Sequence, residues 1–177
     1  MNFAGEGLPA GDYEDCTFTG CDFSNVDLSE FNFLECEFID CNLSLTKLRQ
    51  TSLKDVIFKR CKLLGLHFED CNNMMISFSF DNCSINLCSF NKLKIKKTVF
   101  LDSRIEESDF TETDLSSSQF RNSDLQRTIF NHTNLEGVDF RTSFNYSIDP
   151  EYNRIKKAKF SVSGLPGLLG RYDILIE

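Results

Sequence analysis

Residues 98–142 read TVFLD SRIEE SDFTE TDLSS SQFRN SDLQR TIFNH TNLEG VDFRT, nine units of five residues that each carry Phe, Ile or Leu at the third position. A period of five fits neither the 3.6-residue period of an α-helix nor the two-residue period of a flat strand. The chain must therefore turn a corner once in each unit. A long run of such corners predicts a solenoid, in which successive coils stack along one axis.

The same spacing extends over most of the chain. One series of fourteen large residues runs at intervals of five from Phe3 to Phe68, and a second series of fourteen runs from Met75 to Phe140. We call each of these residues the centre of its unit. Side chains alternate along an extended segment, so the residue two positions before a centre is expected to point inward too. The cysteines of the chain all fall in this inward slot: Cys16, Cys21, Cys36, Cys41, Cys61, Cys71, Cys83 and Cys88.

Units such as Cys16-Thr-Phe-Thr-Gly, Ser108-Asp-Phe-Thr-Glu and Ser123-Asp-Leu-Gln-Arg consist of a small residue, any residue, Leu or Phe, and two polar residues. In these units the chain resembles the pentapeptide repeat family, and the resemblance covers about residues 11–144. It implies an all-β fold, a right-handed quadrilateral parallel β-helix with four units in each coil. Twenty-eight units then make about seven coils. Phe31 and Phe78 place bulk in the small slot, so the coil is expected to swell there.

The chain is expected to form a β-helix over residues 1–144, with an irregular or capping first coil, and a C-terminal cap over 145–177. Two extra residues at 72–74 break the phase of the repeat. A corner bulge and a binding protrusion both fit this insertion. We favour the bulge, because two residues cannot project far and asparagine tolerates a left-handed backbone.

Two interpretations of the segment after residue 144 stay open. Residues 149–151 either begin a helix, with an N-cap and a proline at the first helical position, or lie in a loop after which Ile155 and Phe160 return to register. Residues 172–177 alternate like a strand. The apolar side chains of the cap exceed what one terminal coil can bury, which predicts a two-fold dimer. The expected dimer seam consists of Leu165, Leu168, Leu169, Ile174 and Ile176.

The cysteines are expected to be buried free thiols. Cys21, Cys41, Cys61 and Cys83 fall on one face, where neighbours in parallel strands lie about 4.8 Å apart, and disulfide Cβ atoms lie about 3.8 Å apart. A column of sulfurs is also the wrong shape for tetrahedral zinc. Free thiols indicate a reducing compartment. The start of the chain lacks a signal-peptide pattern and no apolar run is long enough to span a bilayer, so we expect a cytoplasmic protein.

Catalytic chemistry finds little support in the sequence, so an enzyme ranks third after the two binding roles considered below. His67 and His132, the two histidines of the chain, fall at outward positions, away from any inward nucleophile. Neither a glycine-rich phosphate loop nor a metal-ligand spacing appears. We therefore expect a non-enzymatic protein without a cofactor or metal. Its partner is expected to be another protein, bound through the outer surface, with no direct contact with nucleic acid or a membrane.

Charge is banded along the chain, which carries −8 in total. Residues 1–46 hold ten acidic residues and no Lys or Arg, whereas residues 47–62 hold six basic residues and one acidic residue. Residues 92–97 add a second basic patch. The family that the chain resembles includes Qnr-type quinolone-resistance and gyrase-inhibiting members, described as acidic rods that occupy the DNA site of type II topoisomerases.

The resemblance therefore implies DNA mimicry, with DNA gyrase or topoisomerase IV as the partner. The alternative is a general scaffold or interaction module with no topoisomerase role, because the basic belt at 47–62 interrupts every face. Under the first hypothesis the acidic first coils make the contact, since they offer a field without opposing cations. The candidate phosphate surrogates are Asp12, Glu14, Asp15, Asp22, Asp27, Glu30, Glu35, Glu37 and Asp40.

Overall fold

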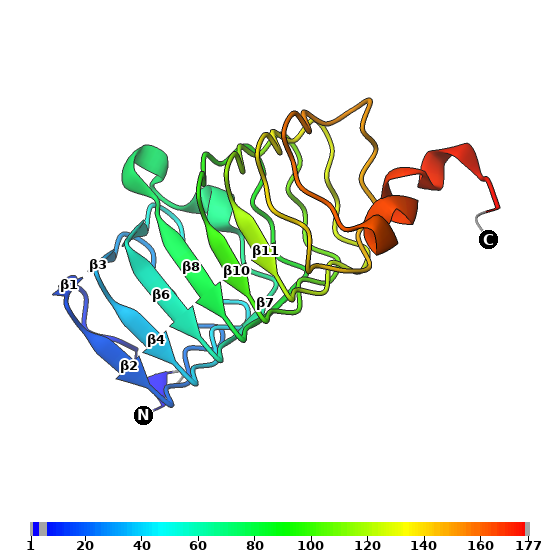
Figure 1. Cartoon of the computed structure of the whole chain (residues 1–177). Coiled ribbons are helices and arrows are strands. Elements are labelled where there is room, and N and C mark those ends of the chain that lie inside the picture. The colour runs from blue at the N-terminus through cyan, green and yellow to red at the C-terminus, as the bar shows by residue number, and fades with distance from the viewer. Residues whose placement is uncertain (1, 4–6, 176–177) are drawn as a thin grey trace.

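The computed structural model describes residues 2–3 and 7–175, apart from the side chain of Met75. The chain winds into a four-faced β-solenoid whose coils stack along one axis (Figure 1). Every strand pair in the described part is parallel, as between Phe18 and Phe38, twenty residues apart. The expected right-handed quadrilateral β-helix is therefore confirmed.

The strands form three sheets. The largest sheet holds β2 (Thr17–Thr19), β4 (Glu37–Ile39), β6 (Val56–Lys59), β8 (Phe78–Asp81), β10 (Val99–Leu101) and β11 (Gln119–Arg121). A second sheet holds β1 (Asp12–Glu14), β3 (Asn32–Leu34) and β5 (Ser52–Lys54), and a third holds β7 (Lys62–Leu64) and β9 (Ser84–Asn86).

Regular strand pairing covers fewer turns than the seven coils expected. The six strands of the largest sheet span five turns, because each coil contributes one strand. Later turns pair through isolated bridges instead, for example between Asn134 and Arg154 and between Asp139 and Lys159. Coil pairing thus continues past residue 144, and the division of the chain at that residue stays a prediction.

Most corner residues, two positions after a centre, take left-handed backbone conformations. Asp15, Leu45 and Lys97 have φ values of 51°, 59° and 61°. Such values are unfavourable for residues with a Cβ atom, so the surrounding structure must hold them. Hydrogen bonds between coils supply this restraint, as where the Leu45 N–H donates to the Leu64 carbonyl at 2.8 Å.

The interior is built from two stacks of phenylalanine rings that face each other. Ring centroids in the longer stack lie 4.6–5.3 Å apart, and those in the shorter stack lie 4.6–5.5 Å apart. The centres Phe90, Phe110 and Phe130 are buried, as expected. Tyr13 and Phe18 are only half-buried, because they belong to the first coil. The longer stack contains Phe18, Phe38, Phe58, Phe80, Phe100, Phe120, Phe140 and Phe160.

Side chains in the inward slot donate hydrogen bonds to the preceding coil. The Thr113 hydroxyl donates to the Phe90 carbonyl at 2.8 Å, and the Ser123 hydroxyl donates to the Phe100 carbonyl at 3.2 Å. Buried polar groups need such partners, because an unpaired one costs about 1–3 kcal/mol. Small donors therefore suit this slot.

The phase break is a pair of short 3-10 turns, η1 (Phe68–Asp70) and η2 (Asn73–Met75). The Asn72 side chain caps η2 by accepting from the Met74 N–H at 3.2 Å. Neither asparagine of the insertion takes the left-handed backbone that asparagine tolerates, because Asn72 has a φ of −65° and caps η2 through its side chain, and Asn73 lies within η2. Pairing resumes between Val56 and Phe78, now 22 residues apart. The side chain of Met75, an expected centre, lies outside the described ones.

The segment after residue 144 contains turns and 3-10 helices. Residues 150–152 form a turn and Phe160 stacks on Phe140 at 5.3 Å, so the loop interpretation is confirmed. The cap contains η3 (Val162–Leu168) and η4 (Gly170–Tyr172). Residues 173–175 form no strand, so the strand expected over 172–177 is wrong in its described part. Three glycines and a proline over 164–170 favour tight turns over an extended ladder.

Candidate protein-binding surface

The nine candidate acids surround the first coils rather than lining one face. Asp12 and Glu14 lie in β1, whereas Glu37 lies in β4, which belongs to a different sheet. Asp22 and Asp27 lie in isolated bridges to Asn42 and Lys47 on further turns of the coil. A flat partner cannot contact all nine acids at once.

Three of the nine acids are neutralised by the basic belt of the next coil. The nitrogen–oxygen distances are 3.6 Å between Arg49 and Glu30, 2.9 Å between Lys59 and Glu37, and 2.7 Å between Arg60 and Asp40. The Arg60 guanidinium donates through two nitrogens to Asp40 and lowers the pKa of that carboxyl. These three carboxylates are less available to a cationic partner than the others.

Four of the remaining acids gather on one edge of the rod. Asp12 and Glu14 lie on β1. Asp15 and Glu35 occupy the same corner in successive coils, with φ values of 51° and 52°. All four are exposed, and none forms an ion pair with a described residue. The Asp12 carboxylate accepts a hydrogen bond from the Asn32 amide at 2.6 Å, which orients it. We call these four residues the acidic edge.

Asp55 extends the acidic edge, although it was not among the candidates. It occupies the corner that follows Glu35, with a φ of 53°, and its carboxylate accepts a hydrogen bond from Ser77 at 2.8 Å. The sequence contains a signal that could have identified Asp55, because Asp15, Glu35 and Asp55 are spaced at intervals of twenty residues, one coil apart. Asp55 was missed because it lies within the basic belt at 47–62.

Asp22 and Asp27 stand apart from the acidic edge. Each carboxylate accepts a hydrogen bond at 3.0 Å from the backbone N–H two residues on, at Ser24 and at Ser29. These hydrogen bonds lower the pKa of both carboxyls. Both side chains therefore serve the local turn, a role that needs no partner.

The expected dimer seam is only partly exposed. Leu168 and Leu169 are half-buried, and Leu168 packs against the core of its own chain. Leu165 and Ile174 are exposed, and Ile176 lies outside the described residues. Val162 and Leu175, which were not among the candidates, are each 86% exposed. Sequence periodicity could not identify them, because the cap does not follow the five-residue repeat.

The described part of the chain shows neither a cluster of three metal ligands nor a membrane-spanning helix. No three of its His, Cys, Asp and Glu side chains come together in an arrangement that could hold a metal ion. None of its helices has the length and apolar character needed to cross a bilayer. The outer surface remains the candidate.

Comparison with known proteins gives the family. The profile described as "Pentapeptide repeat region" matches residues 12–79 and 73–144. The chain belongs to the pentapeptide repeat family. No protein with curated annotation matches the chain, and neither the family nor the structural matches indicate a catalytic family.

Among solved structures, the chain is similar to QnrB1, a plasmid-mediated fluoroquinolone resistance protein. Two trypsin-treated variants superpose with TM-scores of 0.67 and 0.68, each at 20% identity. The match covers 94% of this chain and 90% and 92% of the two QnrB1 chains. At this identity the likeness shows a shared pentapeptide repeat fold.

Proposed function

We propose that this pentapeptide repeat protein acts by binding another protein through its acidic edge, and that the partner is a type II topoisomerase, DNA gyrase or topoisomerase IV. The observation that carries the proposal is the group of unpaired carboxylates at Asp12, Glu14, Asp15 and Glu35. An enzyme surface that receives DNA is built for a row of phosphates, and exposed carboxylates offer the same charge. The likeness to a fluoroquinolone resistance protein supports this choice of partner.

Ion pairs within the chain favour the acidic edge over the other candidate acids as the proposed contact. Glu30, Glu37 and Asp40 already have cationic partners within their own chain, so they would have to exchange one ion pair for another. Such an exchange gains little, because exposed ion pairs contribute about 0–1 kcal/mol each. The unpaired carboxylates break no ion pair when they bind, so they gain the full free energy of each new ion pair with the partner.

A triple neutralisation tests the proposal. In a supercoiling assay with purified gyrase, with and without a quinolone, the wild-type chain is expected to change enzyme activity at low salt. Replacing Asp12→Asn, Glu14→Gln and Asp15→Asn together should raise the concentration needed by about tenfold, because three contacts of about 0.5 kcal/mol each sum to about 1.5 kcal/mol. The effect of the wild type should also fall steeply with added salt.

A matched triple variant controls for changes of net charge. Lys94, Lys96 and Lys97 are exposed, and only Lys96 pairs with a described acid, Asp114, at 3.3 Å. Replacing all three by Gln should preserve or strengthen the effect. The proposal is wrong if neither gyrase nor topoisomerase IV responds to a large molar excess of the wild-type chain at low salt.

A general interaction module without a topoisomerase role is the second candidate. Leu45 and Leu87 favour it, because both are apolar corner residues with 54% and 56% of their surface exposed. Exposed apolar groups often mark protein contacts. This candidate is supported if topoisomerases are unaffected.

We also propose a cytoplasmic location, because the described cysteines are all free thiols, which a reducing compartment preserves.

We further propose that two chains associate through their caps. Val162, Leu165 and Ile174 are exposed apolar residues on this segment, and a two-fold dimer would bury each of them twice. Light scattering should give about twice the chain mass of 20.3 kDa at micromolar concentration. The variant Leu165→Glu should shift the mass to that of the monomer, and a monomeric wild type would contradict the proposal.

A further inference from the structure

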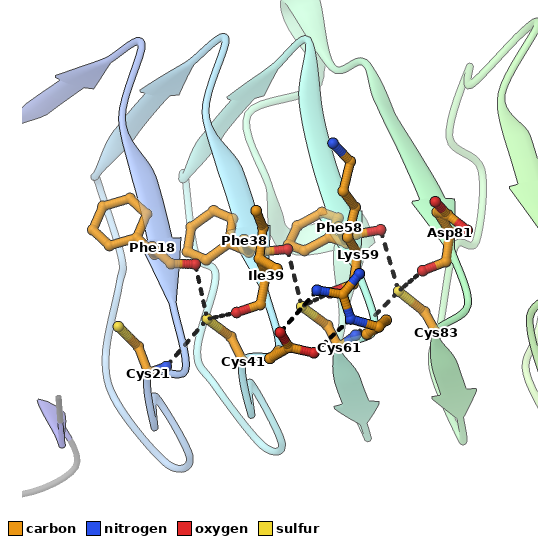
Figure 2. A network of polar contacts seen from close by, with 12 residues as sticks. Phe18, Cys21, Phe38, Ile39, Cys41, Phe58, Lys59, Cys61, Asp81 and Cys83 are labelled. Carbon is orange, nitrogen blue, oxygen red and sulfur yellow. Dashed lines mark hydrogen bonds and ion pairs between the residues drawn. The ribbon is translucent and has the colours of Figure 1, made fainter.

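The core contains a column of thiols that the proposed surface function does not use. Cys21, Cys41, Cys61 and Cys83 occupy the same inward slot in four successive coils, and we call them the thiol column. All four are free and buried. Figure 2 shows their sulfur atoms in a row along the axis of the rod.

Repeated contacts hold these sulfurs in register. The thiols of Cys41, Cys61 and Cys83 each donate to the carbonyl of a phenylalanine in the preceding coil, at 3.2–3.3 Å. Each also contacts the carbonyl two residues before it, at 3.3–3.4 Å. The Cys21 thiol contacts the Thr19 carbonyl at 3.5 Å, and the Cys21 N–H donates to the Cys41 sulfur at 3.4 Å, as the Cys61 N–H does to the Cys83 sulfur at 3.4 Å. Neighbouring sulfurs are therefore separated by the rise of one coil, about 4.8 Å.

This separation selects a particular coordination. It is far longer than a disulfide bond of about 2.05 Å, and a row of sulfurs cannot surround a tetrahedral ion. It does match two metal–sulfur bonds of about 2.3 Å placed end to end, which span about 4.6 Å. Thiolates prefer soft ions. We propose that neighbouring thiols of the thiol column form linear two-sulfur sites for a soft divalent ion, of which Hg²⁺ is the probe.

Charge and proton balance favour a divalent ion. With HgCl₂ as the source, binding breaks two S–H and two Hg–Cl bonds, forms two Hg–S bonds and releases two protons and two chloride ions, without any transfer of electrons. The product, S–Hg–S, is neutral. A monovalent ion between two thiolates would leave one negative charge in an apolar interior, where an unpaired charge is costly. The bond angles at a thiolate sulfur are far from linear, so one sulfur in a straight row cannot lie in line between two ions. Each sulfur of the thiol column therefore binds one ion. The sites are therefore Cys21 with Cys41 and Cys61 with Cys83.

The fold itself supplies the control substitutions. Ser103 and Ser123 continue the thiol column, and the Ser103 hydroxyl accepts from the Cys83 N–H at 3.1 Å. Serine therefore fits this slot, and Cys41→Ser and Cys61→Ser should fold. Cys71 and Cys88 are buried thiols with no cysteine in the same slot of the neighbouring coils, and burial raises the pKa of each to about 12. The mercury that these two cysteines retain shows how strongly an isolated buried thiol binds the ion.

The experiment uses the full chain with Cys16→Ser, which removes a separate pair, Cys16 with Cys36, at the open first coil. The protein is incubated with HgCl₂, washed with excess glutathione, and its retained mercury is counted by native mass spectrometry. We expect about two ions per chain, each with two sulfur neighbours by X-ray absorption. Adding Cys41→Ser should leave one ion, and adding Cys61→Ser as well should leave none. Replacing Cys71 and Cys88 by serine should still leave two.

Several results would overturn the inference. Retention of two ions after Cys41→Ser would place the mercury elsewhere. A single sulfur neighbour would mean that the thiols bind independently. Uptake only after the β-sheet circular dichroism signal is lost would show that the folded core does not admit the ion. The topoisomerase assay is independent of these readouts, so failure of either proposal leaves the other standing.

Discussion

At the scale of single residues, the corners carry the backbone constraint of the fold. Most corner residues with positive φ are polar, but Leu45 and Leu87 are apolar and exposed. The Leu45 side chain folds over Gly65, the corner of the next coil. A Cβ atom built on Gly65 would lie 2.8 Å from Leu45 Cδ2. Glycine at this corner therefore leaves space for the Leu45 side chain and also avoids the strain that a Cβ atom causes at positive φ.

The first prediction concerns this glycine. Gly65 has a φ of +65°, so Gly65→Ala adds both left-handed strain and a contact with Leu45. Strain alone costs roughly 1–2 kcal/mol. Gly137→Ala is the matched control, because Gly137 has a φ of +69° and its nearest side-chain atom, Ser117 Oγ, lies at 3.6 Å. Urea denaturation should give a lower midpoint for Gly65→Ala than for Gly137→Ala. Equal midpoints would show that Leu45 moves aside freely.

At the scale of elements, the cap is docked by close backbone contact with Tyr146. The Ile148 N–H donates to the Gly167 carbonyl at 2.8 Å, and Tyr146 is buried beneath η3. Arg171 then ties η4 to the last turn, with nitrogen–oxygen distances of 3.0 Å to Asp149 and 2.6 Å to Glu151. Gly167 thus allows the close contact between the cap and the backbone at Tyr146, and the ion pairs of Arg171 further stabilise the docked cap.

The second prediction is that Gly167→Ala releases the cap without unfolding the β-helix. An added Cβ would lie 2.4 Å from the Tyr146 carbonyl oxygen, a backbone atom that cannot move aside cheaply. The Ile148 amide should then exchange hydrogen at least about tenfold faster, because its acceptor shifts. Gly170→Ala is the control, since its nearest contact is Ser147 Oγ at 3.6 Å. Unchanged exchange at Ile148 in the Gly167 variant would refute this account of docking.

At the scale of the whole molecule, ion pairs within and between coils offset part of the acidic charge, and acid should destabilise the rod. Hydrogen bonds from Arg60 and Arg141 lower the pKa of Asp40 and Asp139 below the ordinary value of 3.8. A depressed pKa contributes stability above the unfolded value, and this stability is lost as pH falls through the folded pKa. Protonation also leaves 19 Lys and Arg residues without opposing charge.

The third prediction follows from this balance. The thermal unfolding midpoint should stay nearly constant between about pH 7 and pH 5 and fall by about pH 3. Asp139→Asn should show a smaller fall than the wild type, because it has already lost the interaction with Arg141. The measurement is circular dichroism melting in buffers of equal ionic strength. A midpoint that rises at pH 3 would mean that relief of acidic repulsion dominates.

The sequence by itself determined the solenoid, its buried centres and its free thiols. A five-residue period repeats one local rule, in which each unit turns a corner and buries its third residue, so any stretch of the chain specifies the same coil. Where the repeat ends, this rule fails. Asn72 caps a 3-10 turn through its side chain instead of adopting a left-handed backbone, and residues 173–175 form no strand. Both outcomes depend on local hydrogen bonds and turn residues rather than on the repeat.

Only the tertiary structure decided which charges are available to a partner. Asp40 and Arg60 are twenty residues apart, yet winding brings them within 2.7 Å, while Asp15 and Glu35 meet no described cation. Asp55 joins that acidic edge although it lies within the basic belt at 47–62. Ion pairing depends on distances between coils, which a linear sum of charge along the chain does not contain.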